Sequence, residues 1–213
     1  MVPKVDATAD KNRTFVQHLY QDLFGRAVDP GALARLVTTL GQGASRESTV
    51  QGVIGSDEYA TLRLQDLYTR LLHRPVDPQA RNSMLAFLRS GGTEEQVIAV
   101  VAASDEYFQL AGGTPVGLVD RLYADLLGRP ADATGRAQLV AMLGSGTTRT
   151  TVVQLIVAGD EYARDRINAA YQKFLQRPAD APGLQLLRAV FRQGGSRAVI
   201  SALVASAEYH DRK

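Results

Sequence analysis

A motif that recurs four times is the feature that most constrains how this chain can fold. The tetrapeptide Ser-Asp-Glu-Tyr at residues 56–59 returns letter for letter at 104–107, and close variants occupy 159–162 and 206–209. Each closing tyrosine follows an earlier tyrosine by 38 or 39 residues, and these two positions hold all eight tyrosines of the chain. The early tyrosines are Tyr20, Tyr68, Tyr123 and Tyr171, and the late ones are Tyr59, Tyr107, Tyr162 and Tyr209. A fixed internal period of this length is typical of stacked repeat proteins.

Three charged positions recur together with the tyrosines. An arginine stands six residues after each early tyrosine, an aspartate stands three residues after the arginine, and a glutamate directly precedes each late tyrosine. These residues are Arg26, Asp29 and Glu58; Arg74, Asp77 and Glu106; Arg129, Asp132 and Glu161; and Arg177, Asp180 and Glu208. Their constant offsets indicate four copies of one module.

The spacing of the copies divides the chain into two halves. The early tyrosines are separated by 48, 55 and 48 residues. The additional residues of the middle interval fall around Gly112–Pro115, where two glycines and a proline break any helix. We expect a flexible tail over residues 1–12, a first repeat pair over 13–111, a linker over 112–117 and a second repeat pair over 118–213.

The pattern within each copy predicts helices only. Apolar residues ahead of each early tyrosine lie on one helical face, and Gly25 or Gly128 suits the C-terminal end of that helix. Each recurring aspartate suits the N-cap of a second helix, and a third helix is clearest at Thr93 and Gln96, which have capping-box spacing. The predicted fold class is all-α, with four tandem helical repeats of about 48 residues arranged as two paired halves that share connecting helices.

The recurring tetrapeptide is itself predicted to begin a helix. Ser56 suits the N-cap, and the two acids after it fall in the first turn, where negative charge is favourable toward the helix dipole. No helix breaker follows before His73, so one helix should end the first repeat and begin the second. Tyr59 and Tyr68 are about half a turn out of phase on it, so we expect them to face different repeats.

We interpret the recurring charges as structural. Each arginine is expected to reach the glutamate of its own copy, or the capping aspartate, as a partly buried ion pair that sets the angle between helices. Breaking a buried pair from one side costs roughly 3–5 kcal/mol, and breaking an exposed pair less than about 1 kcal/mol. Four equivalent helix starts do not supply the single asymmetric site that acid–base catalysis needs, so we expect no enzyme and no catalytic residue.

Composition argues against several other kinds of site. The chain has no cysteine, and His18, His73 and His210 have no partner at metal-ligand spacing, so we expect no metal and no cofactor. The 24 basic residues are scattered among 22 acidic ones, without the clustering that nucleic-acid binding needs. No apolar run approaches the ~20 residues that span a bilayer, and the N-terminal residues lack the apolar stretch of a secretory signal.

The repeated motif resembles a bacterial repeat family called domain of unknown function 4214. The resemblance lies in the Leu-Tyr, the Gly-Arg, the aspartate and the closing Glu-Tyr, as in "LYQDLFGRAVDPGAL" and "LYADLLGRPADATG", and it covers residues 13–210. The chain departs from the family pattern at two positions. Family members usually have a tryptophan seven residues after the aspartate and a glycine three residues after it, in an Asp-x-x-Gly segment. The tryptophan position holds Leu36, Met84, Leu139 and Leu187, and the glycine position holds Gly135 and Gly183 in two copies but Ala32 and Ala80 in the others.

The resemblance implies an all-helical module without established chemistry, and it supplies no catalytic residue. The family is similar to the linker-domain fold of phycobilisomes, which are light-harvesting assemblies, and it often accompanies secreted or cell-surface bacterial proteins. Stacked helical repeats present extended surfaces and usually serve as binding or scaffold proteins, so we expect a non-enzymatic module for protein–protein interaction or self-association. Glycan binding is the alternative, but it needs exposed aromatic rings, whereas the tyrosines are expected in the core. An enzyme with an unrecognised site is the third hypothesis, and differences among the four copies would be its mark.

Overall fold

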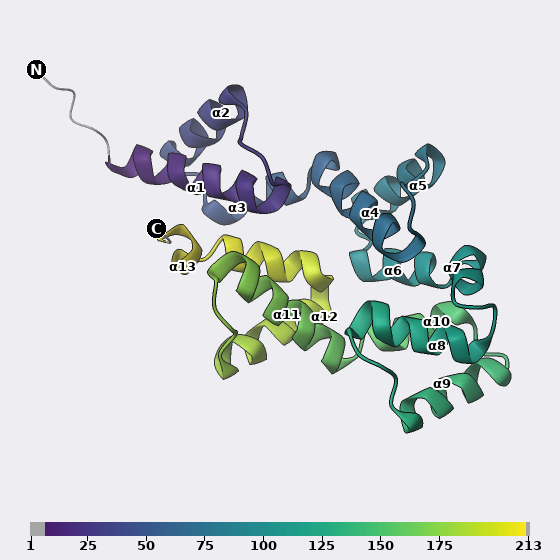
Figure 1. Cartoon of the computed structure of the whole chain (residues 1–213). Helices are drawn as coiled ribbons and strands as arrows, with labels where there is room; N and C mark the ends of the chain where they lie inside the picture. Colours follow the sequence, from purple (N-terminus) through teal and green to yellow (C-terminus); the bar gives the residue numbers. More distant parts are fainter. Residues whose placement is uncertain (1–6, 212–213) are drawn as a thin grey trace, which may run out of the picture.

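The computed structural model describes residues 7–211, which fold into helices and turns without a β-strand (Figure 1). The all-α class predicted from the sequence is confirmed. The first helix begins at Ala7, so residues 7–12, expected within the flexible tail, lengthen this helix instead. Asn12 is buried there, and Asp10 lies in the first turn, where its charge is favourable toward the helix dipole. Residues 1–6 of the expected tail lie outside the described residues.

The helices ahead of the Gly112–Gly113 turn come from the first half of the sequence. They are α1 (Ala7–Phe24), α2 (Pro30–Gly41), α3 (Arg46–Ile54), α4 (Asp57–Leu72), α5 (Pro78–Arg89), α6 (Glu94–Ala102) and α7 (Asp105–Leu110). The helix predicted to connect the first two copies is α4, which runs without interruption from the first Ser-Asp-Glu-Tyr to the residue before His73.

The second half begins with α8 (Pro115–Leu122), which continues into a short π-helical segment, η1 (Tyr123–Leu127). The sequence predicts an uninterrupted α-helix here. Arg70 of α4 donates a hydrogen bond to the backbone oxygen of Asp125 in this segment at 3.3 Å, so one of its carbonyl groups bonds outside its own helix. The remaining helices are α9 (Ala133–Gly144), α10 (Arg149–Val157), α11 (Asp160–Leu175), α12 (Ala181–Val204) and α13 (Ala207–His210).

Side-chain caps begin most of these helices, as the sequence predicts. Each of the four recurring aspartates accepts a hydrogen bond from the backbone N–H three residues on, at 2.7–2.8 Å. The Ser-x-Glu-Tyr serines cap α4, α7 and α13 in the same way, whereas Gly159 precedes α11 without a side-chain bond. Thr93 and Gln96 form the expected capping box at α6.

The residue that ends the first helix of each copy adopts a left-handed backbone conformation. Two copies place glycine there, Gly25 with φ 68° and Gly128 with φ 66°, and the other two place His73 and Gln176, both with φ 56°. A side chain in this region is strained, whereas glycine is not. The two non-glycine residues are therefore sites of local backbone strain.

Replacing Gln176 by glycine is expected to raise the free energy of unfolding by about 0.5–1 kcal/mol, because relief of strain exceeds the added freedom of the unfolded chain. The reverse change, Gly25→Gln, meets no neighbouring atom within 4 Å, so it should lower stability by a similar amount through the backbone alone. Urea unfolding of both variants measures the effect. A Gln176→Gly protein less stable than wild type would contradict it.

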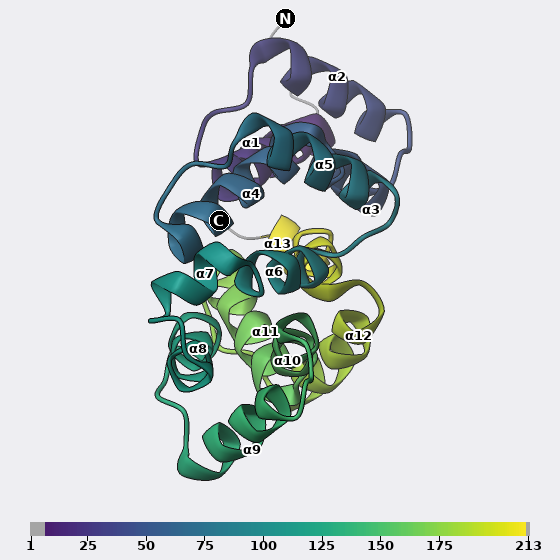
Figure 2. The same ribbon diagram turned by 90° about the vertical axis from the view of Figure 1, so that its right-hand side faces the viewer.

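The third helix of each copy packs in the middle of the molecule. There α6 lies against α10, α3 lies against the C-terminal part of α12, and α6 also contacts α12. Figure 2 shows α2 and α9 at opposite ends of the molecule, with α6 and α10 between them. Helix α12 is kinked at Gly194 and Gly195, whose backbone is not helical, so the segment after these glycines forms a separate helical part.

Two similar contacts join the halves of the chain. The hydroxyl of Tyr107 donates to Asp125 at 2.9 Å, and the hydroxyl of Tyr209 donates to Asp22 at 2.8 Å. Asp22 and Asp125 each lie two residues after an early tyrosine. The second contact brings α13 onto α1, where the rings of Phe15 and Tyr209 meet edge to face at 6.1 Å. Tyr209 near the end of the described chain therefore packs against α1.

Candidate functional site

The recurring arginine and glutamate form an ion pair in every copy. Arg74 donates to both carboxylate oxygens of Glu106, at 2.6 and 2.7 Å, and the third and fourth copies have the same two-bond geometry. In the first copy both bonds of Arg26 go to one oxygen of Glu58, at 3.1 and 2.5 Å. Each arginine also donates to the carbonyl of the next residue, which holds the guanidinium against the turn.

The capping aspartate and the early tyrosine complete this cluster. Asp77, Asp132 and Asp180 lie 3.6 Å from the arginine of their own copy, so both expected partners are reached in three copies. Each guanidinium also lies over the ring of its early tyrosine, at 5.0–5.4 Å from the centroid. The pKa values of Glu106, Glu161 and Glu208 are lowered, chiefly by the hydrogen bonds from their arginines.

These ion pairs lie at the surface. The arginine side chains are 36–42% exposed and the glutamates 33–53% exposed, so water screens the attraction. Replacing Arg74 by alanine is expected to lower the free energy of unfolding by no more than about 1 kcal/mol. Arg89→Ala, which removes a more exposed pair with Asp57, serves as the control and should change little. A loss of about 3 kcal/mol or more for Arg74→Ala in urea unfolding, the size expected of a buried pair, would contradict this assignment.

The eight tyrosines lie in the core, none more than 9% exposed. The ring of Tyr59 packs edge to face against that of Phe24 in the first copy, with 6.0 Å between the ring centroids. The hydroxyl of Tyr68 instead lies 3.7 Å from the sulfur of Met84 in the second copy. The two rings therefore face different copies, as the helical phase predicts. Nothing brings the four clusters into one site, because each stays within its own copy.

The structure explains the glycine of the Asp-x-x-Gly segment. A Cβ atom at Gly135 would collide with the hydroxyl of Tyr123, and one at Gly183 would collide with that of Tyr171. The glycine thus leaves room for the early tyrosine beside the capping aspartate. The first and second copies have Ala32 and Ala80 at this position.

A cavity lies where the two halves of the chain meet. It measures about 620 Å³ and is walled by α1, α4, α11 and α12. We call it the central cleft. Its charged lining residues are Asp22, Arg63, Asp66, Arg166 and Lys173, and Leu62 and Ile200 lie among its apolar ones. Sequence reasoning missed these charges because it followed the positions shared by all four copies, whereas these positions differ between copies.

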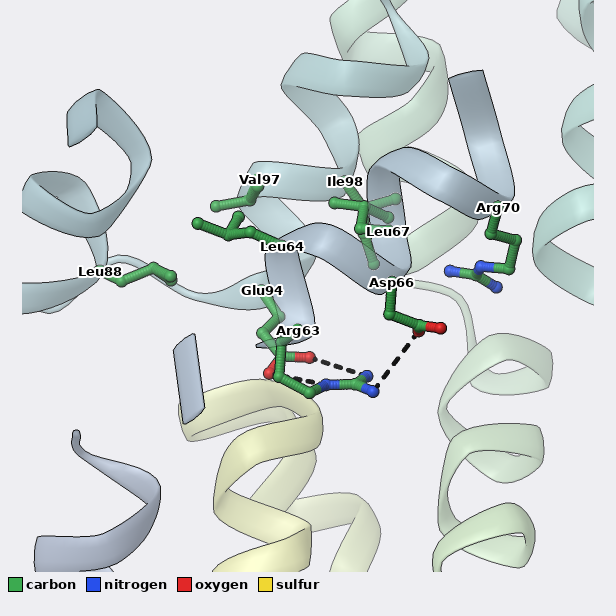
Figure 3. A pocket seen from close by; sticks show the side chains of 9 residues that line it. All are labelled: Arg63, Leu64, Asp66, Leu67, Arg70, Leu88, Glu94, Val97 and Ile98. Atoms are coloured by element: carbon green, nitrogen blue, oxygen red, sulfur yellow. Dashed lines mark hydrogen bonds and ion pairs between the residues drawn. The ribbon is translucent and has the colours of Figure 1, made fainter. Parts of the chain in front are cut away.

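Arg63, on the wall of the cleft formed by α4, pairs with two carboxylates. It lies 3.3 Å from Glu94 and 3.6 Å from Asp66. Figure 3 shows its guanidinium between these carboxylates, beside a small cavity of about 20 Å³ with Leu64, Leu67 and Val97 on its apolar side.

Arg166 is the counterpart of Arg63 in the second half, 103 residues on, as Tyr123 is of Tyr20. Its Nε is buried without a hydrogen-bond partner, and its guanidinium lies 5.2 Å from the ring centroid of Tyr162. Among the described residues no carboxylate lies within 4 Å of it. The two positions that hold Asp66 and Glu94 in the first half hold Ala169 and Arg197 in the second.

Lys173 adds a second positive group to this side of the cleft. It is exposed overall, but partial desolvation where it lines the cleft, together with the charge of Arg63, lowers the pKa of its ammonium group. Asp22 and Asp66 act in the opposite direction. Within the described chain, no three His, Cys, Asp or Glu side chains are placed to hold a metal ion. No described helix is both long and apolar enough to cross a membrane.

Comparison with known proteins gives one match. Residues 6–63 match the family model described as "Domain of unknown function (DUF4214)". This segment contains α1, α2 and α3 and the start of α4, with the first Arg–Glu pair. No curated protein matches the chain, and no solved structure matches it.

Proposed function

Since residues 6–63 match this family, we propose that the whole chain consists of four such modules and serves as a non-enzymatic scaffold for protein–protein interaction. The modules form two paired halves with α4 and α11 as shared connecting helices, similar to the helical fold of phycobilisome linker domains. We further propose that the scaffold works with cell-surface or secreted bacterial systems. The matched segment is the module with which we compare the other three.

The recurrence of the same contacts supports the four-module arrangement. Every copy has an arginine bonded to a glutamate 31 or 32 residues on, beside a buried tyrosine. The Tyr107–Asp125 and Tyr209–Asp22 bonds occupy equivalent places between the second and third copies and between the fourth and first. A closed arrangement with approximate two-fold symmetry accounts for both bonds.

The observation that carries the interaction role is the central cleft. It is built from both halves, and its lining combines apolar side chains with charges of both signs, as protein-binding surfaces do. Leu62 on its wall is 41% exposed. Glycan binding is less well supported, because the tyrosine rings are buried and are not available for stacking on sugars.

Affinity capture from the source organism tests the proposal when the captured protein is identified by mass spectrometry and its binding is reproduced with purified components. We expect one protein to bind in a one-to-one complex, and Leu62→Asp at the cleft wall to weaken it. A glycan array provides the opposing measurement. Specific glycan binding without a reproducible protein partner would overturn the scaffold role in favour of the alternative.

A further inference from the structure

We propose that Arg166 in the central cleft binds a carboxylate from an acidic segment of a partner protein. This inference rests on the proposed interaction role and names the chemistry of the bound segment. It comes from a difference between two equivalent positions, since Arg63 and Arg166 occupy the same place in the two halves of the chain but have different neighbours.

The first half shows which ligand this position accepts. Arg63 is held by the carboxylates of Glu94 and Asp66, at 3.3 and 3.6 Å. A guanidinium pairs with carboxylates through parallel, charge-assisted hydrogen bonds. In the second half the acid three residues on is replaced by Ala169, and the acid at the start of the third helix is replaced by Arg197, so the chain itself offers Arg166 neither carboxylate.

Arg166 is half-buried, and its Nε is the part of the guanidinium that lies buried without a partner. Its buried Nε has no hydrogen-bond partner, and the face of the Tyr162 ring is the neighbour that its guanidinium contacts. A buried donor without a partner is unfavourable. A carboxylate that bonds to Arg166 should therefore provide the stabilisation that Glu94 and Asp66 provide to Arg63 within the chain.

The acids that line the cleft come from α1 and α4, whereas Arg166 and Lys173 both come from α11. Asp22 accepts the Tyr209 hydroxyl, and Asp66 pairs with Arg63. Lys173 lies over the ring of Phe174 at 5.3 Å and lines the cleft with Arg166. The side of the cleft formed by α11 therefore presents two cations to an incoming anion.

The size and walls of the cleft favour a protein segment over a free anion. Its volume of about 620 Å³ is far more than one carboxylate fills, and Leu62, Phe24 and Ile200 give it an apolar wall. Residues on either side of the bound acid have space and apolar contacts there. We therefore assign the cleft to an acidic segment that also carries an apolar residue.

The probe for this site is a synthetic peptide with glutamates around one leucine, and the control peptide has glutamine at every glutamate. We expect the acidic peptide to bind the full chain and to shift the Nε–Hε resonance of Arg166 in ¹H–¹⁵N spectra. Arg166→Gln should weaken binding about tenfold or more, the effect of losing a charged hydrogen bond. Arg164→Gln, which removes an exposed charge on the same helix, should change affinity less than about twofold, as expected of a screened surface charge.

A second variant tests the site without removing Arg166. Ala169→Asp restores the i, i+3 carboxylate that Asp66 supplies to Arg63, so it should pair with Arg166 and also weaken peptide binding about tenfold. Thermal unfolding confirms that each variant is folded.

Any one of several results would overturn the inference. One is equal loss of affinity in Arg166→Gln and Arg164→Gln, which would show only general charge attraction. Another is full affinity in Ala169→Asp. The third is displacement of the peptide by inorganic phosphate at equal ionic strength, which would indicate a site for small oxyanions. If a captured partner protein binds both variants as well as wild type, the carboxylate site fails and the scaffold role stands.

Discussion

Replacing Phe15 by alanine is expected to lower the free energy of unfolding by about 3–5 kcal/mol, the usual effect of emptying a buried aromatic site. Phe15 is 1% exposed. Its ring meets Tyr209 edge to face at 6.1 Å and lies 5.7 Å from the ring of His210. These contacts join α1 to α13, so the substitution removes core volume at the place where the last copy packs against the first.

Phe87→Ala is the control for this prediction. Phe87 is 41% exposed, so its loss should lower stability by less than about 1.5 kcal/mol, in proportion to the apolar area it buries. Urea unfolding of both variants at one pH gives the comparison. Equal effects of the two substitutions would mean that α1 and α13 do not pack together in solution.

Replacing Gly195 by alanine is expected to lower the free energy of unfolding by about 3 kcal/mol or more, because backbone strain adds to a collision at a buried carboxylate. Gly195 has φ 64° and ψ −160°, a conformation that side chains essentially exclude. A Cβ atom there would also collide with Oε2 of Glu95. Glu95 is 8% exposed and joins α6 to α12 by accepting bonds from the backbone N–H and the hydroxyl of Ser196, at 3.0 and 2.6 Å.

A double-mutant cycle separates the two causes. In a Glu95→Ala background the same Gly195→Ala change should cost at least about 1 kcal/mol less, because the collision is gone while the strain remains. Gly52→Ala, where nothing lies within 4 Å of the added atom, should not reduce stability. An unchanged effect of Gly195→Ala in the Glu95→Ala background would show that the two residues are not coupled.

Local features of the fold could be predicted from the sequence because short-range physics determines them. The capping aspartates, the Thr93–Gln96 box and the continuous helix from Asp57 lie within a few residues of their partners. The pairing of Arg26 with Glu58 could also be inferred, since both recur at a constant offset. The left-handed conformation of His73 and Gln176 could have been found by aligning them with Gly25 and Gly128.

Contacts between distant copies could not be predicted in the same way. The Tyr209–Asp22 bond joins residues 187 apart in sequence, and nothing in the sequence around either residue indicates its partner. The bond from Arg70 of α4 to the Asp125 carbonyl likewise joins residues 55 apart in sequence. The lack of a partner for the Arg166 Nε is likewise visible only in the assembled cleft. Aligning the two halves does show, however, that the acids near Arg63 have no counterpart near Arg166.

The closed packing of the fourth copy on the first is the claim on which the cleft and the scaffold role depend. Nuclear Overhauser effects between selectively labelled phenylalanine and tyrosine rings test it most directly, because the Phe15 and Tyr209 rings are 6.1 Å apart. We expect cross-peaks between these two rings in the intact chain, and their loss in Phe15→Ala. Absence of these cross-peaks, together with a Tyr209 ring accessible to a soluble paramagnetic agent, would contradict the closed arrangement.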